Sequence, residues 1–153
     1  MFSDYQIMPL GSSDLQKLME IERAVFDEPW SASIMRDSIH AAHSRVWGIY
    51  AEDDGVLIGF GVITIVMDES ELIDMAVAKE YQGKGYGKVL MQFLIDKAKQ
   101  NGAEKMFLEV GVTNNPAINM YQGLDFTQIN IRKNYYRRKN NVYEDALVYQ
   151  LDF

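Results

Sequence analysis

Cysteine is absent from this chain of 153 residues, and its absence excludes disulfides and thiolate metal sites. Histidine is nearly absent: His40 and His43 are the only two, so no third completes a zinc site and we expect no metal. Basic residues number 15 against 22 acidic ones, which leaves a net charge of −7. This charge argues against direct nucleic-acid binding, which needs a basic surface. It suits a basic peptide as partner, because opposite charges speed encounter.

Long apolar runs are also missing. The sequence contains no stretch of 18 apolar residues, the length needed to span a membrane. The N-terminal residues show neither the basic start nor the apolar run of a secretory signal. We therefore expect a cytoplasmic protein without membrane contact. Its length, with 48% apolar and 24% charged residues, predicts one globular domain over residues 1–153.

Apolar periodicity and turn residues predict an α/β chain. The expected strands cover 5–8, 46–51, 56–66, 71–77, 105–110, 126–136 and 143–151. Helices are expected from residue 12 or 13 to about 24, from 31 to about 41, from 85 to about 101 and from 114 to about 123. Ser12 or Ser13 and Ser31 are the expected N-caps, and Gly102 is the expected stop of the third helix. This order gives a mixed sheet whose front half is largely antiparallel.

Three glycines alternate in the loop that follows the strand over 71–77. Residues 82–87 read Gln-Gly-Lys-Gly-Tyr-Gly and lead directly into a helix. Glycines leave backbone N–H groups uncovered, and the helix adds the positive end of its dipole. Lys84 and Lys88 supply positive charge in an otherwise acidic chain. The loop therefore suits a pyrophosphate.

Better-known phosphate motifs do not fit this loop. A dinucleotide fingerprint starting at Gly83, like a kinase glycine loop, finds Lys88 where its third glycine belongs. A P-loop would need glycine at Gln82 and serine or threonine at Val89. What remains is a Q-x-x-G-x-G pattern, which by itself could also be a glycine-rich turn that starts a helix.

This pattern and the strand order resemble the GNAT superfamily of acyltransferases, whose hallmark is Gln or Arg, two residues, Gly, one residue, then Gly or Ala. More narrowly, the chain is similar to the RimI family, bacterial enzymes that acetylate the N-terminal alanine of a small-subunit ribosomal protein. The matching segments follow the family's order along the chain: 26–31, 74–77, 81–82, 108–110, positions 114, 121 and 126, then 132–136 and 144–146.

Two positions depart from the RimI pattern. Gly111 stands where the family usually has arginine, and we expect a looser contact near the substrate. Asp125 stands where it has the glycine before Phe126, with a glycine at Gly123 instead. We expect this second change to shift the turn after the last helix.

The resemblance implies the GNAT fold, a mixed and mostly antiparallel central sheet flanked by about four helices, with acetyl-CoA as cosubstrate. The main chain of Met75, Ala76 and Val77 would pair with the pantetheine arm, and the Val77 amide would stabilise the oxyanion. Asn114 would contact the pantetheine, although it would serve equally as a helix cap. The residues that this resemblance assigns to the pyrophosphate are Gln82, Gly83, Lys84, Gly85, Tyr86, Gly87 and Lys88.

By the same resemblance Glu109 is the general base and Tyr121 the general acid. The residues alone leave simpler roles open: a polar residue facing outward from a strand, and a core aromatic on a helix. A phenol of pKa about 10 can protonate a thiolate of pKa about 8.5 only slightly uphill. Trp30, Tyr135 and Tyr136 would line the peptide slot, beneath a basic hairpin over 132–139.

The expected reaction is acetylation of a protein N-terminal α-amine, with a basic ribosomal-protein N-terminus as acceptor. Deprotonating an α-amine at pH 7 costs about 1–1.4 kcal/mol, against about 4.6 kcal/mol for lysine, so a carboxylate base fits the α-amine better. The alternatives are a small-molecule amine or lysine acetyltransferase, a non-catalytic acyl-CoA-binding module, and a kinase or nucleotide-binding protein, which the failed motifs disfavour.

Overall fold

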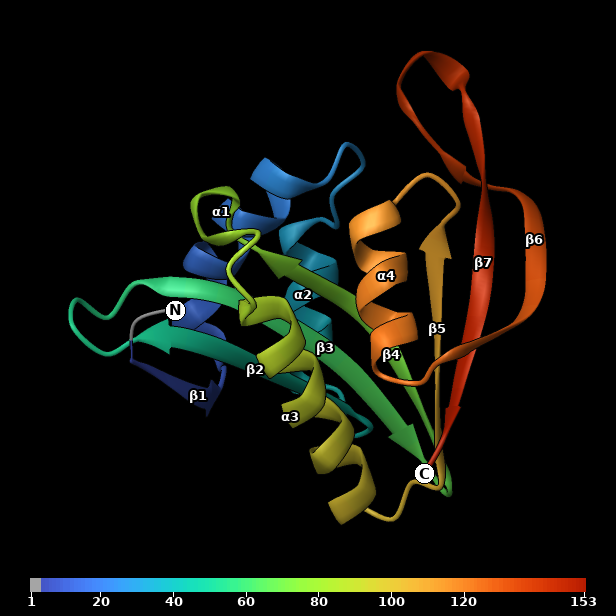
Figure 1. Cartoon of the computed structure of the whole chain (residues 1–153). Coiled ribbons are helices and arrows are strands. Elements are labelled where there is room, and N and C mark those ends of the chain that lie inside the picture. The colour runs from blue at the N-terminus through green and yellow to red at the C-terminus, as the bar shows by residue number, and fades with distance from the viewer. Residues whose placement is uncertain (1–3) are drawn as a thin grey trace.

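The computed structural model describes residues 4–153, which form one seven-stranded sheet in the order β1-β2-β3-β4-β5-β7-β6 (Figure 1). Neighbouring strands are antiparallel except β4 and β5, which are parallel. The strands are β1 Tyr5–Pro9, β2 Ser44–Ala51, β3 Leu57–Val66, β4 Glu69–Val77, β5 Lys105–Gly111, β6 Thr127–Arg137 and β7 Tyr143–Asp152. The helices are α1 Leu15–Val25, α2 Ala32–His40, α3 Tyr86–Gln100 and α4 Asn115–Gly123.

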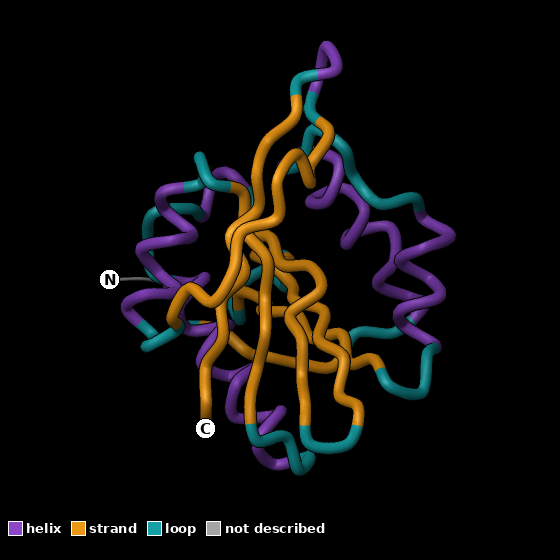
Figure 2. The backbone as a smooth tube through the Cα atoms, turned by 90° about the vertical axis from the view of Figure 1, so that its right-hand side faces the viewer, coloured by secondary structure: helices purple, strands orange, loops and turns teal. Residues whose placement is uncertain are grey.

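Helices cover both faces of the sheet, as Figure 2 shows from the side. One core packs Leu18 of α1 and Met35 of α2 against Phe60 and Val62 of β3. The other packs α3, through residues such as Leu94, against the opposite face. Because β3 is buried on both faces, its side chains form a continuous apolar run rather than an alternating pattern.

An opening in the sheet lies between β4 and β5. Residues 69–71 of β4 pair with residues 105–107 of β5, and the two strands do not pair beyond these residues. The rest of β4 therefore has no strand partner on the edge that faces β5. A bulge follows in β4, because Val62 pairs with Asp74 whereas Ile63 pairs with Leu72. Bulges bend a strand and redirect its side chains. In Figure 1 the upper ends of β4 and β5 separate, with α4 in front of the gap.

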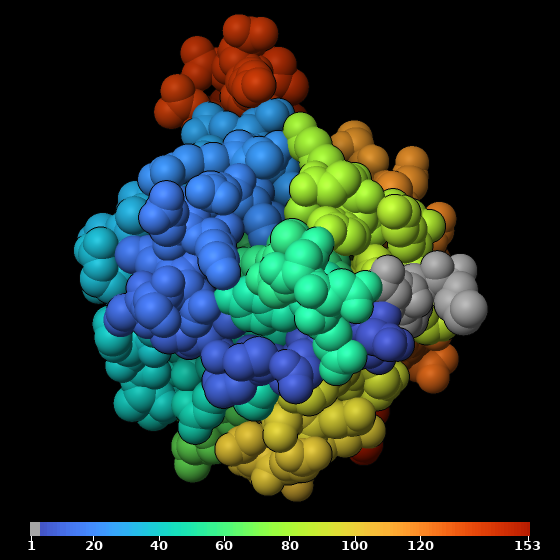
Figure 3. Space-filling view, turned by 90° about the vertical axis from the view of Figure 1, so that its left-hand side faces the viewer, coloured from blue at the N-terminus to red at the C-terminus, as the bar shows by residue number. Residues whose placement is uncertain are grey.

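The β6–β7 hairpin rises beyond the rest of the sheet (Figure 2). Figure 3 shows its tip standing above the surface formed by the first two helices and their connection. Lys139 at this tip forms an ion pair with Asp27 of the α1–α2 connection, Nζ to Oδ1 3.5 Å. The hairpin and the connection therefore approach each other across the same end of the molecule.

The expected elements agree with the structure, except at the start of α1. Ser31 caps α2 by accepting the Ile34 N–H, as predicted. The prediction of a serine cap for α1 was wrong: residues Ser12–Asp14 form a 3₁₀ turn without a side-chain cap. The hydroxyl of Ser12 instead contacts His40 Nε2 at 2.9 Å, a partner from the end of the next helix.

The turn after α4 is not shifted, contrary to our expectation. Asp125 itself adopts φ of 72°, the left-handed conformation that a glycine would take here. The Asp125 N–H then donates to Gln122 O and the Phe126 N–H to Tyr121 O, both at 3.0 Å. Aspartate tolerates this conformation better than most residues, so the turn closes at its usual place.

Candidate active site

A cavity of about 780 Å³ fills the opening between β4, β5, α4, the α1–α2 connection and the β6–β7 hairpin. Its volume falls within the range of small-ligand sites. Seven of the site residues predicted from the sequence line this cavity: Trp30, Met75, Glu109, Asn114, Tyr121, Tyr135 and Tyr136. Residues from five separate elements thus meet where the sequence predicted a single site.

The glycine loop lies outside this cavity lining, at the start of α3. Gly83 and Gly85 have φ of 76° and 94°, which strongly favour glycine, and a Cβ on Gly83 would meet nothing within 4 Å. Gln82 spans the loop, donating from Nε2 to Val77 O at 2.8 Å. The Tyr86 side chain is buried and packs edge-on against Tyr81, so this residue can offer a ligand only its main chain.

The side chains of Lys84 and Lys88 are exposed on either side of the α3 N-terminus. Ala76 is buried in β4, so its side chain belongs to the core and only its main chain is available. Asn114 caps α4, since its Oδ1 accepts the Ala117 N–H at 3.3 Å. The loop, the unpaired edge of β4 and the start of α4 together provide the main-chain donors that an extended, phosphorylated ligand requires.

Glu109 lies on β5 and reaches the cavity. Its Oε2 lies 3.0 Å from Arg132 Nε, but the Arg132 N–H does not point closely enough at this oxygen to count as a hydrogen bond. Its Oε1 receives the Tyr135 hydroxyl at a long 3.5 Å. Oε2 is shielded beneath Arg132, so Oε1 is the oxygen that remains to accept a proton from an amine or a water molecule.

Tyr121 is 7% exposed and packs edge-on against Phe126, with ring centroids 5.8 Å apart. Burial raises the pKa of its hydroxyl above the ordinary value, and the neighbouring Tyr136 and Asp74 raise it further. Tyr121 therefore stays protonated at neutral pH. Because its pKa is raised, the Tyr121 hydroxyl gives up a proton to a thiolate less readily than a free phenol does. Proton transfer therefore requires that negative charge develop on the sulfur close to this hydroxyl.

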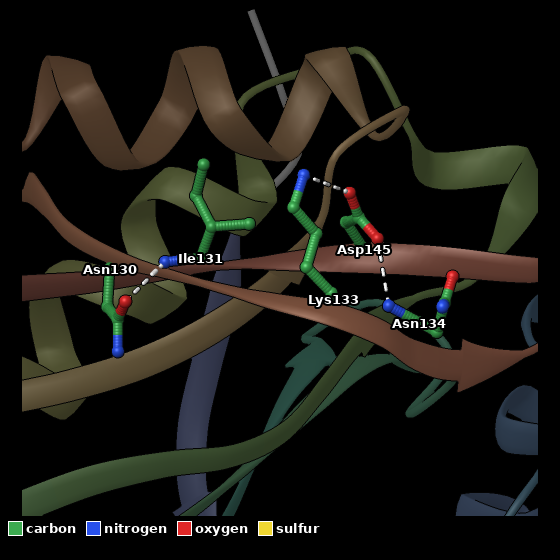
Figure 4. A network of polar contacts seen from close by, with 5 residues as sticks. All are labelled: Asn130, Ile131, Lys133, Asn134 and Asp145. Carbon is green, nitrogen blue, oxygen red and sulfur yellow. Dashed lines mark hydrogen bonds and ion pairs between the residues drawn. The ribbon is translucent and has the colours of Figure 1, made fainter.

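Tyr135 and Tyr136 both line the cavity although they are consecutive residues of β6. Consecutive strand residues normally point to opposite faces, but β6 loses its register with β7 between Arg132 and Tyr136. Figure 4 shows how Asp145 of β7 holds this irregular stretch: it accepts the Asn134 N–H at 2.8 Å and contacts Lys133 Nζ at 3.2 Å. The two tyrosine rings then meet edge-on, with centroids 5.1 Å apart.

The sequence analysis missed a pair of buried carboxyl groups at the cavity. Glu22 of α1 is 1% exposed, and its carboxyl lies beside that of Asp74 at the β4 bulge. Burial, and then the neighbouring Glu22, raise the pKa of Asp74 well above its usual range. Asp74 was noticeable as an acid within an apolar strand, whereas Glu22 resembles any solvated helix residue.

The expectation at Gly111 was wrong, because this position is tightly packed rather than loose. Glu144 of β7 accepts the Thr113 N–H and hydroxyl at 2.8 and 2.6 Å. Arg138 pairs with the same carboxylate, Nε and Nη2 lying 2.8 and 2.7 Å from Oε1. The Arg138 guanidinium also lies over the Tyr136 ring, 4.4 Å from its centroid. An arginine of the hairpin thus occupies the space beside Gly111.

Two further features of the described part of the chain bear on its chemistry. Across residues 4–153 there is no cluster of three or more His, Asp or Glu side chains that could hold a metal ion. Among the helices in this range, none has the length and apolar character needed to cross a membrane.

The family model of the GNAT acetyltransferases matches residues 15–126, most of the chain. The chain belongs to the GNAT family of acetyltransferases. It is an acetyl-CoA-dependent transferase, and the expected fold is confirmed.

Relatives with assigned activities match over nearly their full length. Ribosomal protein bS18-alanine N-acetyltransferase of Haemophilus influenzae is 31% identical over 93% of this chain and 94% of its own. The putative enzyme of the same name from Bacillus subtilis is 34% identical over 88% of this chain and 87% of its own. The similarity to the RimI family inferred from the motifs is therefore confirmed.

Solved structures agree with this assignment. The ribosomal-protein-S18-alanine N-acetyltransferase of Escherichia coli superposes with a TM-score of 0.89, at 30% identity, over 97% of this chain and 94% of that one. NAA60 of Arabidopsis thaliana in complex with acetyl-CoA gives a TM-score of 0.88 at 19% identity, over 98% and 99%, and so supports the fold alone.

Proposed function

We propose that this enzyme transfers the acetyl group of acetyl-CoA to the N-terminal α-amine of a protein, most specifically the N-terminal alanine of a small-subunit ribosomal protein. The observation that carries the reaction is the single cavity to which Glu109 of β5 and Tyr121 of α4 both contribute. The relatives named for this activity support the choice of acceptor. Such acceptors are made in the cytoplasm, and we propose that compartment for the enzyme.

In this proposal acetyl-CoA enters through the opening between β4 and β5. The main chain of Met75, Ala76 and Val77 binds the pantetheine along the edge of β4 that has no strand partner. The Val77 amide receives the oxyanion. The pyrophosphate rests on the loop over 82–88, where Gly83 and Gly85 adopt the positive φ values that occur in anion-binding turns of the main chain.

The reaction proceeds by direct attack, without a covalent enzyme intermediate. The amine nitrogen forms the C–N bond and its proton passes to Glu109, directly or through a water molecule. The C–S bond then breaks, and the Tyr121 hydroxyl gives its proton to the departing sulfur. An α-amine has a pKa of about 7.7–8.0, so its deprotonation at neutral pH costs little free energy and a carboxylate base is sufficient.

The acceptor peptide enters between the α1–α2 connection and the β6–β7 hairpin. Trp30, Tyr135 and Tyr136 form apolar walls there, which suit a small apolar first residue. Carboxylates of Asp27 and Glu28 also line this side of the cavity. Negative charge at the entrance favours a peptide whose following residues are basic.

The direct test is mass spectrometry of a peptide panel after incubation with acetyl-CoA. The panel contains the N-termini of small ribosomal proteins, internal lysine peptides, polyamines and aminoglycosides. We expect one acetyl group on the α-amine of a peptide that begins with alanine. Acetylation of a small amine or of lysine alone would overturn the proposed acceptor. If calorimetry shows that acetyl-CoA binds but no acceptor is acetylated, the proposed catalytic activity is wrong. Binding of ATP, measured as a control, would indicate a nucleotide-binding protein instead.

A further inference from the structure

One buried side chain, Glu22, hydrogen-bonds to the main chain of the α1–α2 connection. Glu22 Oε2 accepts the Trp30 N–H at 2.8 Å, and Trp30, with Phe26 and Asp27, lines the cavity. The other oxygen of the Glu22 carboxyl is buried beside Asp74, at the bulge of β4. Glu22 therefore links a wall of the acceptor cavity to the strand whose next residues, from Met75 on, are assigned to acetyl-CoA.

Two carboxyl groups can bond to each other only when one of them carries a proton. Asp74 Oδ1 accepts the Met75 N–H at 3.0 Å. Glu22 Oε1 and Asp74 Oδ2 are buried and have no hydrogen-bond partner among residues 4–153. An unpaired buried carboxylate is costly, and two adjacent ones repel. A proton shared between these two oxygens satisfies both of them.

Among residues 4–153, no cationic side chain forms an ion pair with either carboxyl group in place of the proton. The titratable groups that share the cavity are Tyr121 of α4, Glu109 of β5 and Tyr136 of β6, together with the acids Asp27, Glu28 and Glu144 and the tyrosine Tyr135. Two arginines, Arg137 and Arg138, also line it, and Arg138 is engaged by Glu144. Among these groups Tyr121 interacts with Asp74, and it is uncharged at neutral pH because burial raises the pKa of its hydroxyl.

We propose that Glu22 and Asp74 are positioning residues for the acceptor: their shared proton fastens the wall at Trp30 to β4, and loss of that proton at alkaline pH releases the wall. This inference rests on the proposed function. With both groups ionised, repulsion in a buried site drives Glu22 away from Asp74 and breaks its bond to the Trp30 N–H. Activity then rises with pH as the acceptor amine loses its proton, and falls again as Asp74 loses its own.

Amide substitutions separate a proton-dependent link from an ordinary structural one. In Asp74→Asn the new amide donates to Glu22 without a titrating proton. In Glu22→Gln the amide donates to Asp74, and its carbonyl still accepts the Trp30 N–H. Both variants keep the link but remove its pH dependence. Asp74→Ala breaks the link altogether.

The measurement is kcat and KM of each variant across pH, with an alanine-initiated peptide and with acetyl-CoA. Both amide variants are expected to stay within about twofold of wild-type kcat/KM at pH 7 and to lose the decline at alkaline pH. Asp74→Ala is expected to raise the peptide KM about tenfold, the value of one lost buried hydrogen bond, with little change in the acetyl-CoA KM. The proposal is overturned if the decline persists in both amide variants, or if Asp74→Asn is as impaired as Asp74→Ala.

A second readout does not depend on activity. Trp30 and Trp47 are the only tryptophans in the chain, and Trp47 packs against Phe93 of α3, outside the cavity lining. In a Trp47→Phe background, Trp30 fluorescence is expected to titrate at alkaline pH and to become flat when Asp74→Asn is added. Titration without acetylation of any peptide would reject the proposed function alone. Acetylation without titration would reject the positioning role alone.

Discussion

Gly111 lies directly against the carboxylate of Glu144: a Cβ built on Gly111 would come 2.5 Å from Glu144 Oε2. Glu144 cannot easily withdraw, because Thr113 and Arg138 hold both of its oxygens. The absence of a side chain at 111 therefore leaves room for the link between β5 and the hairpin that carries Tyr136.

Gly111→Ala should disrupt this link. Moving the Glu144 carboxylate weakens charge-assisted hydrogen bonds, at a cost of about 1–3 kcal/mol in unfolding free energy. We also expect a higher KM for peptide, since Arg138 would no longer be held over Tyr136. Thermal denaturation and steady-state kinetics measure the two effects. Gly123→Ala is the matched control, because a Cβ there meets nothing within 4 Å in helix α4 and should be neutral or stabilising. Equal stability of both variants would contradict the packing.

Gly85→Ala should weaken acetyl-CoA binding. Gly85 has a φ of 94°, a left-handed conformation that alanine adopts only under strain. Forcing alanine into a left-handed conformation costs about 1–2 kcal/mol, and the loop can escape by changing shape. Calorimetry should then show acetyl-CoA affinity lowered by about tenfold, with peptide KM little changed. Unaltered affinity would mean that the loop does not bind the cosubstrate.

Tyr121→Phe should keep the fold and lose turnover. Phenylalanine fills the same buried space beside Phe126, and only the hydroxyl is removed. We expect kcat at saturating acetyl-CoA to fall about 10- to 100-fold, with little change in acetyl-CoA KM. An unchanged kcat would exclude Tyr121 as the proton donor to sulfur.

Asp74→Asn should stabilise the protein more at higher pH. Asp74 has a pKa raised in the folded state, so between its unfolded value of about 3.9 and its folded value the native protein binds the extra proton. Stability of the wild type therefore falls as pH rises through this window, whereas the amide does not titrate. At pH 7, roughly three units above the unfolded pKa, the variant should gain up to about 4 kcal/mol, and below pH 4 the difference should vanish. Denaturant unfolding at several pH values measures it, and a gain independent of pH would contradict a shared proton.

Much of the fold could be predicted because its signals are local. Gly102 and Ser31 are boundary residues whose roles depend on neighbours within a few positions, and the structure agrees with both predictions. Glu109 and Tyr121 were recognised from motifs, and they line one cavity. Their catalytic roles remain predictions.

The features that the sequence did not reveal depend on partners far along the chain. Ser12 binds His40 rather than its own helix. Glu22 acquires its role only when α1 packs beside Asp74, which no helical pattern indicates. Gly111 is explained by Glu144 and Arg138, more than 25 residues away, so the absent arginine suggested a gap where the structure has a tight contact.

The central claim is acetylation of an α-amine by a reaction that uses Glu109. The most direct measurement is tandem mass spectrometry, over a pH series, of one peptide that begins with alanine and also contains lysine, with wild type and Glu109→Gln. The account predicts acetyl on the α-amine only, at a rate that Glu109→Gln lowers about 10- to 100-fold at pH 7, with a smaller deficit above the amine pKa of about 8. Acetyl on lysine alone, or equal rates for the two proteins at pH 7, would contradict it.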